Sequence, residues 1–333
     1  MKELRKALEP LSTVVSGTPA VRRETVGEEG ENQRIDNWLL RQLKGVPKSH
    51  IYRILRSGEV RVNGKRVDAT CRLAIGDEVR IPPVRMAAVD PEDRPAPGRD
   101  FDVAFEDEFL IALHKPAGVA VHGGSGVSFG VIEQLRSARP EARFLELVHR
   151  LDRETSGLLL VGKKRSALTA LHDLMREGGV EKRYFTLVKG RWMNPLQHVR
   201  QPLKKYLLEN GERRVEVHPE GKVAHSIVRL VARWQDYSLL EVELKTGRTH
   251  QIRVHLTHLG FPLCGDDKYG DFALNKVLQK DGLKRMFLHA ARLSFMHPGT
   301  GTRLELAAAL PADLQAFIDT LDRNGRRDYG QAV

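Results

Sequence analysis

One segment limits the possible folds of this chain more than any other. The strongly polar residues 149–157 run without a break into the apolar residues 158–161, which Gly162 closes. A short apolar run bounded by polar residues is typical of a strand buried on both faces. Within the polar part, the carboxylate of Asp152 stands between Arg150 and Arg153. Because an ordinary link uses Gly, Asn or Pro, this carboxylate at the mouth of a core strand indicates a chemical role.

The charge of the chain favours a polyanionic partner. The 333 residues carry a formal net charge of +11, which favours nucleic acid over an anionic membrane surface. Residues 33–85 contain twelve basic and five acidic side chains and therefore hold most of the excess. A solvated basic surface would have the same composition, but this concentration near the N-terminus predicts an electrostatic binding surface.

The same residues 33–85 have the pattern of a small α+β module. Apolar positions at helical spacing predict a helix over residues 35–44, and Ser49 opens a second helix that ends at Gly58. Alternating valines on either side of Asn63-Gly64 predict a hairpin. The basic side chains on the second helix and the hairpin are the predicted RNA-binding residues: Lys48, Arg53, Arg56, Arg61 and Lys65. The module resembles the RNA-binding domain named after small-subunit ribosomal protein S-four, mainly through residues 60–65.

Proline clusters and composition divide the rest of the chain. Residues 1–32 lack a sustained period and are expected to form a flexible N-terminal arm. Residues 86–100 have the prolines of a semi-rigid linker. Residues 101–322 then predict a sheet-rich, mainly antiparallel α+β domain, in which short strands follow one another between turn residues. Residues 323–333 are expected to be a C-terminal tail.

Three familiar motifs are present only in part. The segment from Gly157 to Lys163 approaches a phosphate-binding loop, but Lys164 stands where Ser or Thr should follow, and the intervening residues favour a strand. Residues 122–126 are similar to an esterase oxyanion loop, yet the chain has no Gly-x-Ser-x-Gly elbow. The histidines near Cys264 lack the spacing of a zinc site. We therefore expect no metal and no cofactor.

Asp152 remains as the leading candidate. An arbitrary turn aspartate would simply bond its own backbone. Here, however, basic residues surround it in sequence and recur in a second basic segment at Arg248 and Arg253. A carboxylate that a guanidinium keeps ionised serves as a nucleophile or an electrostatic stabiliser, not as a proton donor near neutral pH.

The segment His149-Arg150-Leu151-Asp152-x-x-Thr155-Ser156-Gly157 resembles the catalytic motif of pseudouridine synthases of the RluA family. Three further segments are similar to that family in the same order, at residues 115–118, 182–190 and 246–253. With the N-terminal module, the resemblance covers about residues 33–310. It implies isomerisation of specific uridines in 23S ribosomal RNA to pseudouridine, by glycosidic bond cleavage, base rotation and attachment at C5.

The resemblance also implies roles for individual residues. Asp152 should be catalytic and act on the linkage between ribose and base. Arg253 should pair with Asp152 and hold it ionised, and Tyr184 should stack on the uracil and assist proton removal at C5. Arg150 should fill the place that the flipped nucleotide leaves, which would offset the few kcal/mol of base extrusion.

The expected partner is 23S rRNA or a large-subunit assembly intermediate, with no membrane and no obligatory protein partner. Two distant cysteines, no signal-peptide pattern and no run of membrane-spanning length favour a reduced, cytoplasmic setting. The alternative from another class is a non-catalytic RNA-binding ribosome assembly factor in which Asp152 is structural.

Overall fold

The computed structural model describes residues 20–43, 45–84, 96–124, 128–325 and 328–329. The chain divides into two compact units, Met1–Arg94 and Pro95–Val333. Among the described residues, no helix is both long and apolar enough to cross a membrane.

The small unit is built around one four-stranded sheet in the order β1-β4-β2-β3. Its apolar core comes mainly from the inner faces of two helices and the alternate residues of the strands, and Ile35, Leu39, Ile51 and Val79 are fully buried in it. The elements, in chain order, are β1 (Arg22–Thr25), the 3-10 helix η1 (Glu28–Gly30), α1 (Ile35–Gln42), α2 (Lys48–Arg56), β2 (Arg61–Val62), β3 (Lys65–Arg66) and β4 (Glu78–Ile81). Both predicted helices and the predicted hairpin are present.

The prediction that residues 1–32 form a flexible arm is wrong for residues 20–32. Residues 1–19 lie outside the described part of the chain, but Arg22–Thr25 form β1 and pair antiparallel with β4. Val26, directly after this strand, is buried in the core of the unit. The strand is charged and mostly exposed, so backbone pairing with a sheet edge fixes it and no apolar alternation announces it.

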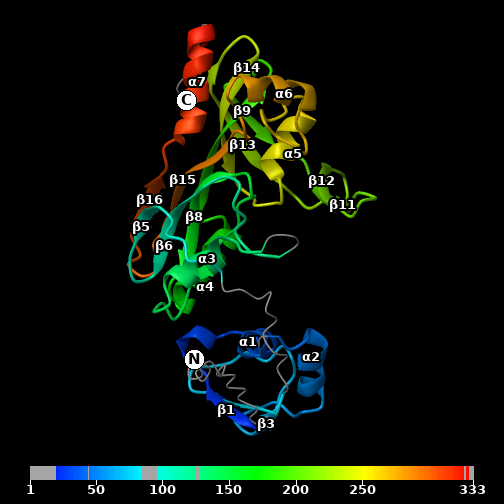
Figure 1. Ribbon diagram of the computed structural model, residues 1–333, viewed down its shortest axis with the longest axis vertical. Helices are drawn as coiled ribbons and strands as arrows, with labels where there is room; N and C mark the ends of the chain where they lie inside the picture. Colours follow the sequence, from blue (N-terminus) through cyan, green and yellow to red (C-terminus); the bar gives the residue numbers. More distant parts are fainter. Residues whose placement is uncertain (1–19, 44, 85–95, 125–127, 326–327, 330–333) are drawn as a thin grey trace, which may run out of the picture. The chain divides into compact units, whose positions relative to one another are not determined.

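The large unit is a sheet-rich α+β domain, as predicted (Figure 1). Within its described residues, eleven strands form one sheet along the path β10-β13-β14-β9-β15-β8-β6-β5, with β7, β16 and β17 paired beside it. Every pairing is antiparallel except that of β8 with β15. A separate hairpin, β11–β12, lies outside this sheet.

The elements of the large unit follow in chain order. They are β5 (Val103–Glu106), β6 (Leu110–Lys115), α3 (Val131–Ala138), β7 (Glu146–Leu147), β8 (Ser156–Gly162), α4 (Arg165–Glu177), β9 (Glu181–Lys189), β10 (Leu196–Val199), β11 (Leu203–Leu207), β12 (Arg213–Val217), β13 (Ser226–Arg233), β14 (Tyr237–Leu244), α5 (Gln251–His258), α6 (Phe272–Lys280), β15 (Leu288–Met296), β16 (Arg303–Ala307), α7 (Ala312–Asn324) and β17 (Asp328–Tyr329).

Strand β8 contains the apolar run of residues 158–161, and all seven of its residues are buried. Leu159 and Val161 face one apolar cluster, whereas Leu158 and Leu160 face another that includes α4. A strand covered on both faces has no polar side to alternate with, which explains its continuous apolar sequence.

Two other expectations need correction. The predicted tail, residues 323–333, begins inside α7, and Asp328–Tyr329 pair with β13 as β17; residues 326–327 and 330–333 lie outside the described part. Of the predicted linker, residues 86–95 are likewise not described, and residues 96–100 have no helix or strand.

Candidate active site

Asp152 lies in the loop that joins β7 to β8, and its side chain is 28% exposed. The loop is held to its surroundings through backbone atoms. The Thr155 amide donates to the Asp152 carbonyl at 3.1 Å, and the Gly118 amide donates to the Arg153 carbonyl at 2.9 Å. The carboxylate is therefore presented to solvent from a fixed backbone.

Lys115 ties the loop to the preceding turn. Its side chain is 1% exposed, and its Nζ donates to the carbonyls of Pro116, Val119 and Arg153 at 2.7, 2.7 and 3.0 Å. Burial lowers the pKa of Lys115 to about 7. The three carbonyl acceptors match the three N–H donors of the ammonium group. Lys115 thus fastens residues 115–119 to the loop of Asp152.

Arg253 reaches Asp152 from α5, a hundred residues later in the chain. Its Nη1 lies 3.4 Å from Oδ2 of Asp152, and its side chain is 4% exposed. The shorter contacts go elsewhere: Nε and Nη2 donate to the two carboxylate oxygens of Asp266 at 2.7 and 2.6 Å. The predicted pairing with Asp152 is present, but Asp266 is the carboxylate that fixes the guanidinium.

Asp266 was not among the residues predicted from the sequence. It is fully buried and also accepts the backbone amides of Lys268 and Tyr269. Burial alone would raise the pKa of Asp266, but the hydrogen bonds and charge of Arg253 lower it below the usual range. A fork-to-fork pair of this kind gives orientation as well as energy. Asp266 therefore sets the direction in which Nη1 points at Asp152.

A second group approaches Asp152 from the start of the same helix. His250 lies just before α5 with a left-handed backbone, φ 53°, and its Nε2 is 3.9 Å from Oδ2 of Asp152. Its Nδ1 lies 2.8 Å from the hydroxyl of Tyr269, which also accepts the amide of Val215 at 2.9 Å. Strained backbone conformations of this type concentrate at functional sites.

The contacts of Tyr269 define the proton positions on His250. Burial lowers the pKa of His250, so the ring is neutral near pH 7. The Tyr269 oxygen already accepts one N–H, so its own hydrogen is free to donate to Nδ1 of His250. We therefore infer that His250 carries its proton on Nε2, the atom that faces Asp152.

Tyr184 lies on β9 and is 6% exposed. It belongs to the same apolar cluster as Leu151 and Ile252, the residues that directly precede Asp152 and Arg253. Burial, together with the charge of Asp152, raises the pKa of Tyr184 above its usual range. The phenol is therefore neutral, and it lies near enough to Asp152 for that charge to act on it.

Arg150 is exposed on the loop of Asp152, and among the described residues its side chain makes no hydrogen bond or ion pair. It is thus available to a ligand, as its predicted role requires. The structure brings Asp152, Tyr184 and Arg253 together, and it adds Asp266, His250 and Tyr269. No local sequence pattern marks Asp266 as the partner of Arg253, which lies 13 residues before it.

The predicted RNA-binding residues lie together on the small unit. Lys48, Arg53 and Arg56 project from α2, whereas Arg61 and Lys65 belong to β2 and β3, and all five are exposed. Arg53 faces Glu59 at 4.0 Å, and Arg61 donates to the carbonyl of Gly64. No contact in the structure assigns them a ligand, and their role stays a prediction.

Two of the three partial motifs occupy ordinary structural positions, and residues 125–126 of the third, the apparent oxyanion loop, lie outside the described part of the chain. The residues of the apparent phosphate loop are the buried strand β8. His255 bonds Ser226 and the Gln201 carbonyl, and Cys264 is buried. No group of three potential metal ligands occurs within the described ranges. Residues 119–122, whose apolar pattern suggests a short strand, are a loop whose carbonyls of Ala120 and Val121 accept the first amides of α3.

Comparisons with known proteins identify relatives of both units. The RNA pseudouridylate synthase family model matches residues 109–258, and the S4 domain model matches residues 33–79. The chain is 50% identical over 316 residues to "Ribosomal large subunit pseudouridine synthase C" of Escherichia coli strain K12, covering 93% of this chain and 99% of that protein. It is also 50% identical over 311 residues to the protein of the same name from Salmonella typhi, and that alignment covers 91% of this chain and 98% of that protein.

Solved structures show the same fold at low identity. Human RNA Pseudouridylate Synthase Domain Containing 4 aligns with a TM-score of 0.55 and 24% identity over 66% of this chain and 92% of that one. Human RNA Pseudouridylate Synthase Domain Containing 1 aligns with a TM-score of 0.57 and 22% identity, over 71% of this chain and 93% of that one.

Proposed function

The chain belongs to the RNA pseudouridylate synthase family, and from this premise we propose that it converts uridines of 23S ribosomal RNA into pseudouridine. It is an RNA pseudouridine synthase with an S4 domain ahead of its catalytic domain. The large-subunit target is supported by the shared name of relatives that match it over nearly their whole length. The single observation that carries the catalytic proposal is the pairing of a solvent-accessible Asp152 with the buried Arg253.

The reaction needs no external reactant. The bond from N1 of uracil to C1′ of ribose breaks, the base turns, and a bond forms from C5 to C1′. C5 then loses its proton, and N1 gains one, so that atoms and charge balance. The reaction requires a carboxylate at the ribose, a path for the C5 proton and a pocket that retains the free uracil.

Asp152 supplies the carboxylate, acting on the linkage between ribose and base. Nη1 of Arg253 lies 3.4 Å from one of its oxygens, and His250 offers its Nε2 at 3.9 Å. Both groups stabilise negative charge on Asp152: the buried Asp266 holds Arg253, and the half-buried Tyr269 holds His250. Preorganised donors of this kind need no rearrangement when the reaction occurs.

Tyr184 contacts the base, and Arg150 fills the gap that the base leaves in the RNA. Tyr184 is a buried aromatic beside Asp152 and can stack on uracil while its oxygen assists removal of the C5 proton. Arg150 is exposed on the same loop and can occupy the stack that the extruded nucleotide vacates. Extrusion costs a few kcal/mol, so a side chain that fills the vacancy favours the flipped state.

The decisive test is Asp152→Asn in the full chain, with pseudouridine formation measured on 23S rRNA transcripts and on isolated assembly intermediates. We expect the rate to fall on the order of 10⁴-fold or more, with RNA binding retained, because the amide keeps the shape and removes the charge. Glu154→Gln is the matched control: its carboxylate is in the same loop, and within the described residues its ion pair is with Arg153. Undiminished pseudouridine formation by Asp152→Asn would leave a non-catalytic RNA-binding role for this loop.

The compartment is part of the proposal as well. We place the protein in the cytoplasm, which the two free thiols, Cys71 and Cys264, support. Cell fractionation with an antibody against the chain tests this, and recovery outside the cytoplasmic fraction would contradict it.

A further inference from the structure

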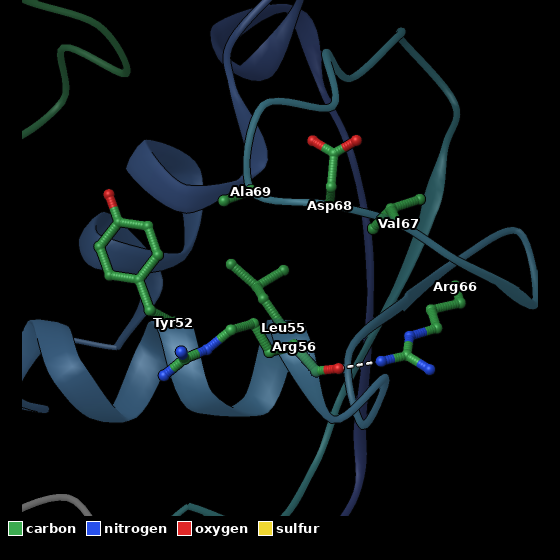
Figure 2. A pocket seen from close by; sticks show the side chains of 7 residues that line it. All are labelled: Tyr52, Leu55, Arg56, Arg66, Val67, Asp68 and Ala69. Carbon is green, nitrogen blue, oxygen red and sulfur yellow. Dashed lines mark hydrogen bonds between the residues drawn. The ribbon is translucent and has the colours of Figure 1, made fainter.

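The small unit contains a pocket that the reaction does not use. Its volume is about 440 Å³, within the roughly 300–1,000 Å³ range of ligand sites. It lies between α2 on one side and the end of β3 with the residues after it on the other, and Figure 2 shows side chains from both segments around it. The lining residues are Tyr52, Leu55, Arg56, Arg66, Val67, Asp68 and Ala69.

Tyr52 is an exposed aromatic residue whose ring is held in one orientation. Its side chain is 39% exposed, yet its hydroxyl donates to Oδ2 of Asp36 at 3.0 Å. Asp36 is itself 2% exposed and accepts two hydrogen bonds from Arg34 and one from the Asn37 amide. The hydrogen bond to Asp36 raises the pKa of Tyr52. The fold thus anchors the hydroxyl and leaves the ring open to the pocket.

Two arginines give the pocket a positive charge. Arg56 follows Tyr52 by four residues on α2, so both side chains project from the same face of the helix (Figure 2). The guanidinium of Arg66 donates to the Arg56 carbonyl at the end of that helix. The one lining carboxylate, Asp68, is engaged by the amide and hydroxyl of its own neighbour Thr70. Leu55, Val67 and Ala69 supply the apolar part.

We propose that this pocket binds one unstacked nucleotide of the RNA substrate, with the base against the Tyr52 ring and the phosphate facing Arg56 and Arg66. The proposal rests on the proposed function, since that function makes RNA the ligand. An aromatic ring and guanidinium groups in one cavity form the combination that binds single-stranded nucleic acid. The tether to Asp36 orders the ring before binding, which reduces the entropic cost of association.

The test compares two RNAs that lack accessible uridine. One is a labelled 20-nucleotide single strand of adenosine and cytidine, and the other is the same strand paired with its complement. Binding to the full chain is measured by fluorescence anisotropy. Tyr52→Ala should weaken binding of the single strand about 5- to 150-fold, which corresponds to the loss of one stacked base. Binding of the duplex, whose bases are stacked internally, should change less than about twofold by the same reasoning.

Further variants separate the role of the Tyr52 ring from effects of its hydroxyl, of the surface and of the arginine charges. Tyr52→Phe keeps the ring and should retain the larger part of the affinity. Ile75→Ala removes an apolar side chain that is 54% exposed on the same unit outside the pocket, and it should bind both RNAs like the unmodified chain. Arg56→Gln and Arg66→Gln should each reduce the salt dependence of single-strand binding by about 0.7 in the log–log slope.

Three outcomes would overturn the proposal. In one, Tyr52→Ala melts at a lower temperature but binds both RNAs normally, so that Tyr52 only covers Asp36. In another, both RNAs lose affinity equally, which indicates a general phosphate surface. In the third, Tyr52→Phe binds as weakly as Tyr52→Ala. The proposed function fails separately, if the unmodified chain forms no pseudouridine.

Discussion

At the scale of single residues, the strongest partner of Arg253 is not the carboxylate that the sequence motifs suggest. Arg253 looks like the dedicated partner of Asp152, but it gives its two shortest bonds to Asp266 and leaves Nη1 for Asp152. One buried carboxylate therefore neutralises most of the guanidinium charge. This arrangement leaves Asp152 loosely bound and free to approach a ribose, while the arginine cannot swing away.

Tyr269 is a positioning residue for this arrangement. Its ring lies under the guanidinium of Arg253 at 5.1 Å, and its hydroxyl joins Val215 of β12 to His250. Tyr269→Phe keeps the ring contact and deletes both hydrogen bonds. We expect kcat to fall about 10- to 100-fold, because His250 loses the bond that aims its Nε2 at Asp152, while KM changes little.

The check on Tyr269→Phe is steady-state kinetics together with thermal unfolding. Tyr237→Phe, on β14, is the control because its ring packs in a different apolar cluster. A variant that melts at a lower temperature but shows unchanged kcat would make Tyr269 purely structural.

The sequence could predict Asp152, Tyr184 and Arg253, since each stands in a recognisable motif. It could not predict Asp266, Tyr269 or the role of His250. Those contacts depend on how α5 and the chain after it fold back over β12, and no local periodicity encodes such a return. The same limit applies to Tyr52, whose tether to Asp36 joins two helices.

At the scale of elements, the active site depends on the contact between β8 and β15. These two strands run parallel, with Ser156 opposite His289 and Gly157 opposite Ala290. Gly157 has φ 111°, and a Cβ there would collide with the Ala290 carbonyl oxygen. The strand that leaves the loop of Asp152 can approach its neighbour only because residue 157 has no side chain.

Gly157→Ala tests this dependence. We expect it to destabilise the large unit by roughly 3 kcal/mol or more, since backbone strain and overpacking add, and to abolish most activity by shifting Asp152. Gly162→Ala is the matched control at the other end of β8, where the nearest atom to a new Cβ is a side-chain carbon at 3.3 Å. Urea unfolding of both variants is the measurement. Equal stability of the two variants would mean that β8 can relax away from β15.

Strands with apolar sequences were predictable and strands fixed by pairing were not. Residues 237–244 form β14, because their side chains fit a buried sheet. Strand β1 is charged, and β11 has exposed Lys205, Tyr206 and Leu207. These two owe their conformation to backbone bonds with β4 and β12. Residues 119–122 show the opposite case: they are largely apolar, yet they form a loop in which the carbonyls of Ala120 and Val121 accept the first amides of α3.

At the scale of the whole molecule, the chain keeps several histidines neutral inside the large unit. Burial lowers the pKa of His149 to about 4 and that of His289 to about 4. Their hydrogen bonds fit the neutral ring: Nε2 of His149 accepts the Leu160 amide, and His289 bonds Ser156 and the Ala308 carbonyl. Both rings therefore support β8 beside the loop of Asp152.

This arrangement predicts a loss of stability in mild acid. A histidine in the unfolded chain takes up a proton near pH 6.5, whereas these two stay neutral in the folded chain down to about pH 4. Between those values the unfolded state binds more protons, so the free energy of unfolding falls as the pH falls. Each histidine can contribute up to about 3 kcal/mol. Burial also lowers the pKa of His225, His250 and His255, which adds to the same trend.

The measurement is urea unfolding of the full chain between pH 7 and pH 5. In this window Asp266, whose pKa Arg253 lowers, stays charged, and the transition of Lys115 lies at the upper end. We expect the free energy of unfolding of the large unit to decrease steadily across the window. His149→Gln, whose amide oxygen can accept the Leu160 amide, should flatten that dependence, whereas His258→Gln at an exposed position should not. A pH dependence that His149→Gln leaves unchanged would mean that water reaches the His149 ring and lets it titrate normally beneath the loop of Asp152.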